Sequence, residues 1–410
     1  MKRNPGHARL LIYSHDSFGL GHLRRCSAIA HSLVAHRTDL SVLILSGSPI
    51  IGSFDFRSRV DFVRVPGVIK LRHGDYTPLN LEMGIDEVLA MRASIIRHTA
   101  EVFAPDIMLV DKEPLGLRGE VKDTLAMLKA RGVPLVLGLR DVIDDPDLLA
   151  DEWARKNTLP ALDTLYDHIW VYGLPEILDP LKGVAVPASV RDKITFTGYL
   201  RRGRADDSLG SVPLPFGSNQ PYILVTPGGG GDGGDLIDWV LRAYEHDPNL
   251  PYPAILVLGP FMHGNLQSEF MARARRLPSV AAITFDAHVE RLVENAIGVV
   301  AMGGYNLFCE ILSFDKPGLI VPRTVPRMEQ YIRAARAQEL GLVRMLPEGE
   351  NRGPEIMVAA LRELPHSPRP SSVRVPGLLD GLSVINGMID GWLSRRRTSP
   401  ARLSVVNRTD

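Results

Sequence analysis

The chain has 410 residues, of which 45% are hydrophobic and 23% charged, so it is long enough for two or three domains that each bury a core. Its 47 basic and 47 acidic residues balance, which gives no overall attraction to nucleic acid or to an acidic membrane. The only cysteines are Cys26 and Cys309, so no disulfide framework is expected and a reducing cytoplasm is the expected location. The sequence has no signal-peptide pattern and no run near the roughly 20 apolar residues that span a bilayer. We therefore expect a cytoplasmic protein, with peripheral association at the inner membrane face left open.

The first half of the chain alternates short β-branched runs with amphipathic helical patterns. The predicted strands are residues 10–14, 40–45, 60–65, 107–111, 134–139, 169–172 and 194–197. The predicted helices include residues 22–37, 85–103 and 121–130. This alternation is typical of an open parallel sheet with helices on both faces.

A polar segment with several glycines and prolines, residues 201–221, then interrupts the alternation and is interpreted as an interdomain linker. After it, strands are predicted at 222–226, 254–258, 281–285, 297–301, 318–321 and 342–345, and helices at 235–245, 267–277, 289–296, 305–314 and 329–340. The pattern predicts an α/β protein of two tandem Rossmann-like, doubly wound domains, residues 1–200 and 222–375, with ligands in the cleft between them. A helix over 376–394 is expected to cross back to the first domain, and 395–410 to form a disordered tail.

The first domain carries a glycine-containing turn between its first strand and first helix. Gly19 and Gly21 allow the backbone to approach an acceptor, and His22 follows at the start of the helix. A neutral imidazole at this place can accept a proton from an attacking hydroxyl. The alternative is that both glycines only form a turn and His22 caps its helix.

Two further parts of the first domain are candidates for the same cleft. Asp111 and Glu113, at the end of a predicted strand, are reserve general bases, and the alternative is that residues 111–114 form only a hydrogen-bonded loop near the cleft. Residues 68–83 form either a wall of an acceptor site or simply a long loop.

The second domain begins with a turn that has six glycines among residues 228–234. Such a density costs backbone entropy, and its usual function is to present N–H groups at a helix N-terminus to a pyrophosphate. The turn lacks the Lys-Ser/Thr ending of a P-loop and is not a regular G-x-G-x-x-G motif. Asp232 and Asp235 are poor neighbours for phosphate, and Asp235 is predicted to be the N-cap of the following helix.

Residues 302–331 combine a Gly303-Gly304 turn, a short helix, a strand and a second helix. Glu310 lies within the first of these helices among apolar residues, where a carboxylate is costly unless it faces a polar ligand or water. Cys309 beside it is interpreted as a small packed residue. This segment is the predicted ligand-binding wall of the second domain.

A series of motifs in chain order resembles the GT-B glycosyltransferases, and most closely the lipid-linked GlcNAc transferase of peptidoglycan synthesis. The motifs are Gly19-x-Gly21-His22, Thr197-Gly198, the glycine turn, Phe285-Asp286-Ala287-His288, and the segment from Gly304 to Tyr331, which matches without a gap. The resemblance implies a GT-B fold and inverting transfer of a hexosyl group from a nucleoside diphosphate sugar, UDP above all. It further implies a small-molecule or lipid-linked acceptor, no metal or cofactor, no nucleic-acid partner, and a role in bacterial envelope or glycoconjugate synthesis.

The same resemblance implies roles for individual residues. Glu310 would accept hydrogen bonds from the ribose diol, and Gln330 would contact hydroxyls of the donor sugar. The remaining donor-site residues would be Arg202, Gly229, Gly230 and Gly231 at the pyrophosphate, Phe285 and His288 at the base, and Gly303, Gly304 and Glu329 beside them. Glu329 replaces the family's glutamine, and residues 323–328 also depart from the family pattern, so the identity of the sugar is open.

Two other classes of function share this scaffold. The first comprises nucleotide-sugar hydrolases and 2-epimerases, in which water or an eliminated intermediate replaces the acceptor. The second is a non-catalytic protein that binds a sugar nucleotide without turnover.

Overall fold

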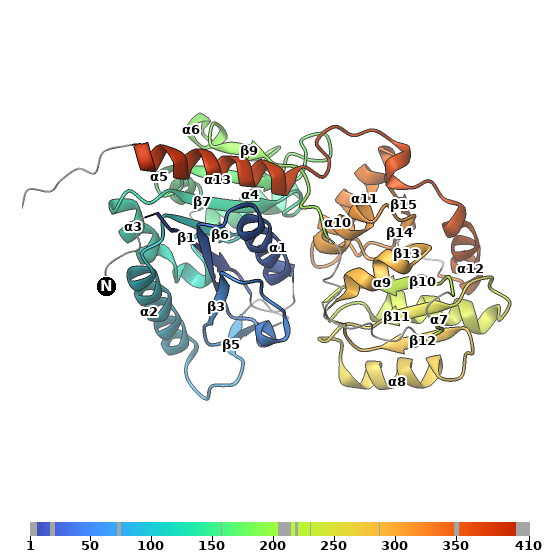
Figure 1. Cartoon of the computed structure of the whole chain (residues 1–410). Coiled ribbons are helices and arrows are strands. Elements are labelled where there is room, and N and C mark those ends of the chain that lie inside the picture. The colour runs from blue at the N-terminus through green and yellow to red at the C-terminus, as the bar shows by residue number, and fades with distance from the viewer. Residues whose placement is uncertain are drawn as a thin grey trace, which may run out of the picture.

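The protein folds into two α/β domains that lie side by side (Figure 1). The computed structural model describes residues 6–16, 21–71, 75–156, 158–203, 215–217, 220–229, 231–286, 288–347 and 352–398. Two predicted site residues, Gly19 and Gly230, lie outside the described residues, as do residues 399–410 of the predicted tail.

The first domain is built on a seven-stranded parallel sheet with the order β3-β2-β1-β6-β7-β8-β9. The strands are β1 (Ala8–Ser14), β2 (Leu40–Ser46), β3 (Val60–Arg64), β6 (Ile107–Asp111), β7 (Leu135–Arg140), β8 (His168–Tyr172) and β9 (Ile194–Phe196). All seven predicted strands form. The strand order reverses between β1 and β6, whose last residues, Ser14 and Asp111, are register partners. Open sheets of this kind bind ligands beyond the carboxyl ends of the strands at that reversal.

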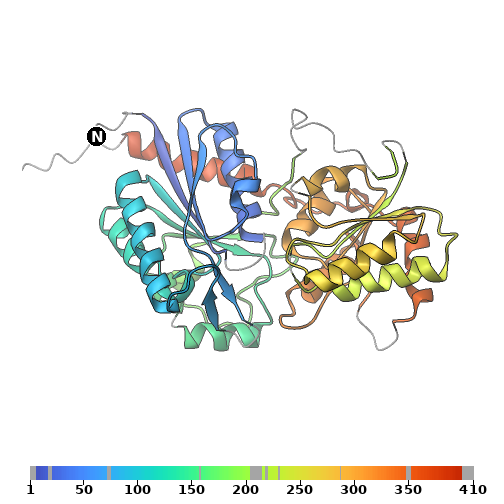
Figure 2. The same cartoon turned by 90° about the horizontal axis from the view of Figure 1, so that it is seen from below.

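Helices cover both faces of this sheet because successive strand residues point to opposite sides. Leu10 and Ile12 of β1 pack in one cluster with α1 (Gly21–His36) and α13 (Gly381–Thr398), whereas Leu11 and Tyr13 pack on the other side. The helices of that other side are α2 (Ile85–Phe103), α3 (Lys122–Ala130), α4 (Pro146–Arg155), α5 (Thr158–Thr164) and α6 (Ala188–Arg191). Within residues 68–83, β4 (Val68–Lys70) and β5 (Tyr76–Pro78) pair as an antiparallel ribbon. Figure 2 shows the layers from below.

The second domain repeats the arrangement with a six-stranded parallel sheet of order β12-β11-β10-β13-β14-β15. Its strands are β10 (Ile223–Thr226), β11 (Ala254–Val257), β12 (Val280–Ile283), β13 (Gly298–Ala301), β14 (Gly318–Ile320) and β15 (Arg344–Met345). Its helices are α7 (Gly234–His246), α8 (Gly264–Ala274), α9 (Val289–Asn295), α10 (Tyr305–Ser313), α11 (Glu329–Glu339) and α12 (Pro354–Glu363). The strand order reverses between β10 and β13, so this crevice opens beside the glycine-rich turn and Gly303-Gly304. The predicted doubly wound architecture is confirmed in both domains.

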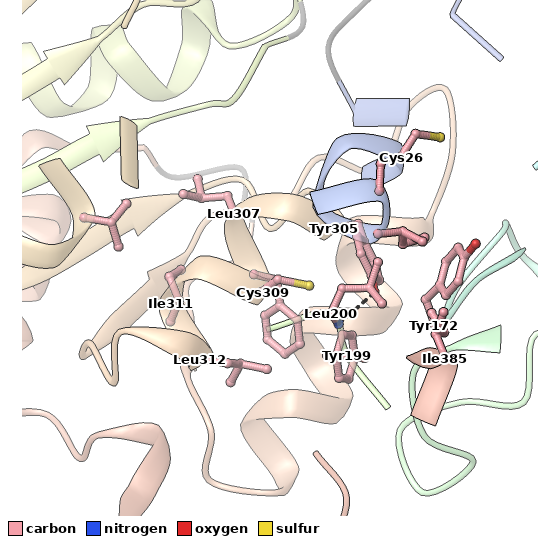
Figure 3. Close-up of a cluster of buried hydrophobic side chains, with 14 of the residues drawn as sticks. Cys26, Tyr172, Tyr199, Leu200, Tyr305, Leu307, Cys309, Ile311, Leu312 and Ile385 are labelled. Carbon is pink, nitrogen blue, oxygen red and sulfur yellow. Dashed lines mark hydrogen bonds between the residues drawn. The ribbon is translucent and has the colours of Figure 1, made fainter. Parts of the chain in front are cut away.

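Helix α10 is shared by the two cores (Figure 3). Tyr199, on the segment that leaves β9, stacks on Tyr305 at 5.8 Å between ring centroids and meets Phe308 edge-on at 5.2 Å. The backbone N–H of Leu200 points to the Tyr305 hydroxyl at 3.5 Å. One continuous apolar cluster therefore joins the domains and fixes α10 against the first domain.

Helix α13 lies against the first domain, although the chain reaches it from the second (Figure 1). Ile385, Ile389 and Leu393 are buried, and Trp392 stacks on His168 at 4.3 Å and on Trp170 at 5.8 Å. Residues 395–398, predicted to belong to a disordered tail, instead continue the helix. This last turn of the helix contains three arginines, and arginine is a good helix former, so the helix continues beyond its buried residues. Within the described part of the chain, no helix combines the length and apolarity required to cross a membrane.

Candidate functional site

His22, Asp111 and Arg25 form a buried polar cluster at the strand reversal of the first domain. His22 Nδ1 lies 2.5 Å from Asp111 Oδ2, and Arg25 donates to both oxygens of the same carboxylate at 2.8 and 2.6 Å. Asp111 is fully buried at the end of β6, and the His22 side chain is 17% exposed. The carboxylate accepts the Nδ1 proton, so the other ring nitrogen, Nε2, carries the lone pair. Among the described residues Nε2 has no hydrogen-bond partner, so it can accept a proton.

The surroundings of His22 keep its imidazole neutral. Burial lowers the pKa of His22, and the Arg25 guanidinium lowers it further, against the opposing effect of Asp111. Burial alone would raise the pKa of Asp111, but Arg25 and His22 hold that carboxyl well below its usual range. The pair is therefore a carboxylate and a neutral imidazole at neutral pH, which is the form that a general base requires.

The reserve bases Asp111 and Glu113 have different positions. Both oxygens of Asp111 are bound by Arg25 and one also by His22, so Asp111 orients the imidazole instead of acting as a separate base. Glu113 receives a 3.1 Å hydrogen bond from Lys156. Burial raises the pKa of Glu113, but Lys112, His15 and Lys156 outweigh it and lower the pKa to about 2. Glu113 is thus an ion-paired carboxylate at the rim of the cleft.

His15 is a second buried histidine, beside the His22–Asp111 dyad. The sequence patterns did not single it out. Its ring meets His22 edge-on with centroids 5.8 Å apart, and its Nδ1 is 3.3 Å from the Tyr13 hydroxyl. Burial lowers the pKa of His15 to about 3, so it stays neutral. It packs against the His22 ring and helps to fix its orientation.

A cavity opens at the strand reversal of the second domain. It encloses about 450 Å³ of empty space, its opening to solvent included. Its walls come from the ends of β10, β11 and β12, from α9 and α10, and from the first domain; they are Arg24, Phe54, Thr226, Gly228, Gly229, Val257, Gly259, Pro260, Phe285, Asp286, Val289, Leu307 and Glu310. Three predicted donor-site residues, Gly229, Phe285 and Glu310, therefore line one cavity.

Glu310 is the unusual group in this cavity because it is fully buried and short of hydrogen bonds. Arg24, on α1 of the first domain, approaches one of its oxygens at 2.7 Å and Glu290 at 2.5 Å. The contact with Glu310 is an ion pair without hydrogen-bond alignment, so both carboxylate oxygens still lack a hydrogen bond among the described residues. Burial raises the pKa of Glu310 to about 7, and nearby Glu290 contributes in the same direction. A ligand hydroxyl would supply the missing hydrogen bonds.

At two positions of the glycine-rich turn the backbone has no room for, or does not favour, a side chain. Gly228 has φ of +102°, and a Cβ on Gly233 would lie 2.0 Å from the Pro227 side chain. Gly233 is the N-cap of α7, so the prediction that Asp235 caps this helix is wrong. Asp235 instead pairs with Arg352 at 3.2 Å, because it lies in the first turn and points outward. Asp232 pairs with Arg323, and the predicted pyrophosphate ligand Gly231 is exposed and does not line the cavity.

Arg202 lies at the junction of the two domains. Its guanidinium donates to Asn306 Oδ1 at 2.5 Å and to the Arg24 carbonyl at 3.2 Å, and its buried Nε has no acceptor within the described part of the chain. Asn306 in turn donates to the Gly21 carbonyl at 3.0 Å. These contacts hold the first turn of α10, which Gly304 caps, next to the first turn of α1.

The remaining predicted donor residues lie around α11 and α9. Gly303 has φ of +84°, and its carbonyl accepts from Arg333 at 2.8 Å. Glu329 is buried and lies 2.5 Å from Arg140 of the first domain, while the Gln330 side chain accepts from the Arg323 backbone at 3.2 Å. Although burial raises the pKa of Glu329, the neighbouring arginines lower it to about 2.

His288 of the predicted base-binding motif precedes α9 and contacts the first domain. Its Nε2 is 3.5 Å from Asp55, and its backbone N–H donates to Asp286 at 2.7 Å. Asp286 lines the cavity but His288 does not. Phe285 and His288 thus belong to one sequence motif, but only Phe285 lines the cavity.

The sequence matches no protein-family model and none of the curated proteins compared with it. Solved structures, in contrast, are similar over nearly the whole chain. A UDP-GlcNAc 2-epimerase from Neisseria meningitidis bound to UDP-GlcNAc has a TM-score of 0.60 at 14% identity, over 94% of this chain and 100% of that one. UGT2 of Phytolacca americana, complexed with UDP-2fluoro-glucose and pterostilbene, has a TM-score of 0.59 at 15% identity, over 96% of both chains. CalG4, the calicheamicin glycosyltransferase, has a TM-score of 0.58 at 15% identity, over 95% of this chain and 99% of that one.

The fold is GT-B. Within this GT-B fold, His22 lies at the strand reversal of the first domain and Glu310 at that of the second. The narrower resemblance to the lipid-linked GlcNAc transferase stays a prediction.

Three charged residues of the site, Arg24, Arg25 and Glu290, were not predicted from the sequence, because charged residues on amphipathic helices normally face solvent. The spacing of Arg25, three residues after His22, was the available signal, since such pairs share a helix face.

Proposed function

We propose that the protein transfers a glycosyl group from a nucleoside diphosphate sugar to an acceptor hydroxyl, with His22 as the general base. His22 Nε2 takes the hydroxyl proton as the acceptor oxygen bonds to the anomeric carbon. The bond from that carbon to the phosphate oxygen breaks, and the nucleoside diphosphate leaves with the electron pair. A single displacement of this kind inverts the anomeric configuration.

One observation carries this proposal: the first turn of α1 connects both halves of the chemistry. His22 and Arg25 of this turn contact Asp111 in the first domain. Arg24, between them in sequence, enters the cavity of the second domain and contacts Glu310. The proposed base, His22, and the buried carboxylate of Glu310 thereby lie on either side of the interdomain cleft, which supports a donor and an acceptor meeting there.

The lining of the cavity supports the proposed donor roles of Glu310 and the glycine-rich turn. Glu310 would accept hydrogen bonds from the ribose diol, in place of its present contact with Arg24. The N–H groups of the glycine-rich turn, together with the Arg202 guanidinium, would offset the charge that develops on the leaving diphosphate. In this proposal no metal ion is assigned that role. UDP is the proposed nucleotide and a hexosyl group the transferred sugar, with Gln330 and Glu329 near its hydroxyls.

Product analysis tests the proposal. The protein is incubated with UDP- and dTDP-sugars, with and without a pool of hydroxylated acceptors, and nucleoside diphosphate and glycosylated products are measured by mass spectrometry. We expect diphosphate release that depends on an acceptor and a matching glycoside of inverted configuration. Binding of the donor without any turnover would instead indicate a non-catalytic sugar-nucleotide-binding protein.

A second candidate function is a nucleotide-sugar 2-epimerase or hydrolase. It is favoured by the likeness to the UDP-GlcNAc 2-epimerase, which covers 94% of this chain. In that case the donor alone would be consumed, and a 2-epimer or free sugar would accumulate without an acceptor. Acceptor-dependent turnover excludes this candidate.

A further inference from the structure

Besides Arg202, four cationic side chains around the interdomain cleft have unmade hydrogen bonds among the described residues. Within the described residues, the Lys112 ammonium has no hydrogen-bond or ion-pair partner. In the same described part of the chain, Arg140 Nε, Arg323 Nε and Arg327 Nη1 are buried atoms without a hydrogen-bond acceptor, although Arg327 Nη1 lies 3.3 Å from Asp144 Oδ2 as an ion pair. Buried donors without partners are rare in folded proteins. One buried acceptor in this group, Glu329 Oε2, also lacks a hydrogen bond among the described residues, so the unmatched donors outnumber the unmatched acceptor.

These cations belong to one cluster centred on Glu329. Glu329 lies 2.5 Å from Arg140 and 3.7 Å from Arg323, so two guanidinium groups share one carboxylate. The other nearby carboxylates have cationic partners of their own: Asp144 and Glu152 contact Arg327, Asp232 contacts Arg323, and Glu113 contacts Lys156. Lys112 is thus left without a carboxylate.

The backbone fixes Lys112 next to the catalytic dyad. Lys112 follows Asp111 directly, has φ of +75°, and donates its N–H to the Gly138 carbonyl at 2.8 Å. A left-handed conformation is costly for a residue with a side chain and is retained mainly at functional sites. Arg140 ends the neighbouring strand β7, so both cations lie at the same sheet edge as Asp111.

Electrostatic effects agree with this placement. Burial lowers the pKa of Lys112 to about 8, and Arg140 contributes in the same direction. The Lys112 charge in turn lowers the pKa of both His15 and His22. The ammonium is therefore partly desolvated and close to the proposed base. Glu113 and Glu329 attract it from beyond ion-pair distance, so an anionic ligand in direct contact would stabilise it further.

We propose that the acceptor carries an anionic group, a carboxylate or a phosphate, near the hydroxyl that is glycosylated, and that Lys112 and Arg140 bind this group beside His22. This inference rests on the proposed function. The donor diphosphate is another source of an anionic group that Lys112 and Arg140 could bind. However, neither Lys112 nor Arg140 lines the cavity that holds Glu310, whereas both adjoin the dyad where the acceptor hydroxyl is deprotonated.

The test compares acceptors that differ only in charge. Initial rates are measured for wild type, Lys112→Met and Lys112→Arg with glycerol 3-phosphate against glycerol, and with glycerate against glyceramide. Lys156→Met is the matched control, because Lys156 is half-exposed and forms its ion pairs at the rim. The affinity for UDP is measured for each variant by calorimetry.

In wild type, kcat/KM is expected to favour the anionic acceptor at least tenfold. In Lys112→Met this preference should largely disappear through a higher acceptor KM, while Lys112→Arg and Lys156→Met retain it and the Kd for UDP is unchanged. Equal use of charged and neutral acceptors by wild type would overturn the inference. So would a Lys112→Met variant that binds UDP more weakly but keeps its acceptor preference, since the anion would then be the donor diphosphate.

A direct binding measurement separates this inference from the proposed function. If no acceptor is glycosylated, glycerol 3-phosphate is titrated into the UDP-saturated protein by calorimetry. Binding to wild type that is lost in Lys112→Met supports the anion site even though transfer fails. Absence of binding to wild type rejects the site.

Discussion

A general base works only in its neutral form, and the surroundings of His22 favour that form. Burial and the Arg25 charge lower the pKa of His22 below its ordinary value of about 6.5. The imidazole therefore loses its proton at a lower pH than a free histidine, and activity should fall only as pH drops through this lowered pKa. We expect the acid limb of kcat, measured at saturating donor so that titration of free Glu310 does not contribute, to lie below pH 6.5, with a plateau at pH 7. An acid limb centred above pH 7 would be incompatible with this assignment.

Removal of the imidazole should affect turnover without affecting the nucleotide. His22→Ala is expected to lower kcat by about 10²–10⁴-fold, the usual contribution of general-base catalysis. The Kd for UDP should stay the same, because His22 does not line the cavity with Glu310. His36→Ala is the control, since His36 is on the same helix but pairs with Asp390 on the surface. Near-normal turnover in His22→Ala would remove this residue from the mechanism.

At the scale of single elements, α13 is expected to be an integral part of the first domain. Ile389→Ala removes a fully buried side chain, and such a substitution typically costs about 2–5 kcal/mol of unfolding free energy. Ser383→Ala on the exposed side of α13 should change it by less than about 0.5 kcal/mol. Denaturant unfolding of both variants measures the difference. A loss below 1 kcal/mol in Ile389→Ala would mean that the helix is dispensable.

The elements themselves could be predicted from the sequence, because their apolar periodicity reflects burial that every sheet of this kind requires. The position of Glu310 within α10 and of Asp111 at the end of β6 followed from the same patterns. The partners of these groups could not be predicted. The ion pairs of Arg24 with Glu290 and of Arg333 with Asp141 join residues far apart in sequence, and only the docking of two domains brings them together. The continuation of α13 to Thr398 was missed because a basic terminal segment has no apolar pattern of its own.

At the scale of the whole molecule, one buried ion pair links the domains behind the cleft. Arg333 of α11 and Asp141 after β7 are both fully buried and 2.7 Å apart, and Tyr199 donates to the same carboxylate at 2.6 Å. Arg333→Met leaves that charge without its cation, which typically costs about 3–5 kcal/mol. Arg336→Met, three residues along α11, removes a partly exposed guanidinium that pairs with Glu339 and donates to the Glu176 carbonyl at 2.9 Å, and should cost less than about 1 kcal/mol. Similar losses for the two variants would show that this pair does not hold the domains together.

We propose that the two domains enclose a site for a nucleoside diphosphate sugar, with Glu310 as a ligand-binding group. The most direct measurement is the melting temperature of the protein with a panel of nucleoside diphosphates and their sugars. A ligand at 100 times its Kd stabilises the folded state by about 2.7 kcal/mol. We predict a clear rise in Tm with uridine or thymidine diphosphate sugars, and a much smaller rise in Glu310→Ala relative to its own unliganded Tm. No rise with any nucleoside diphosphate sugar would contradict the account.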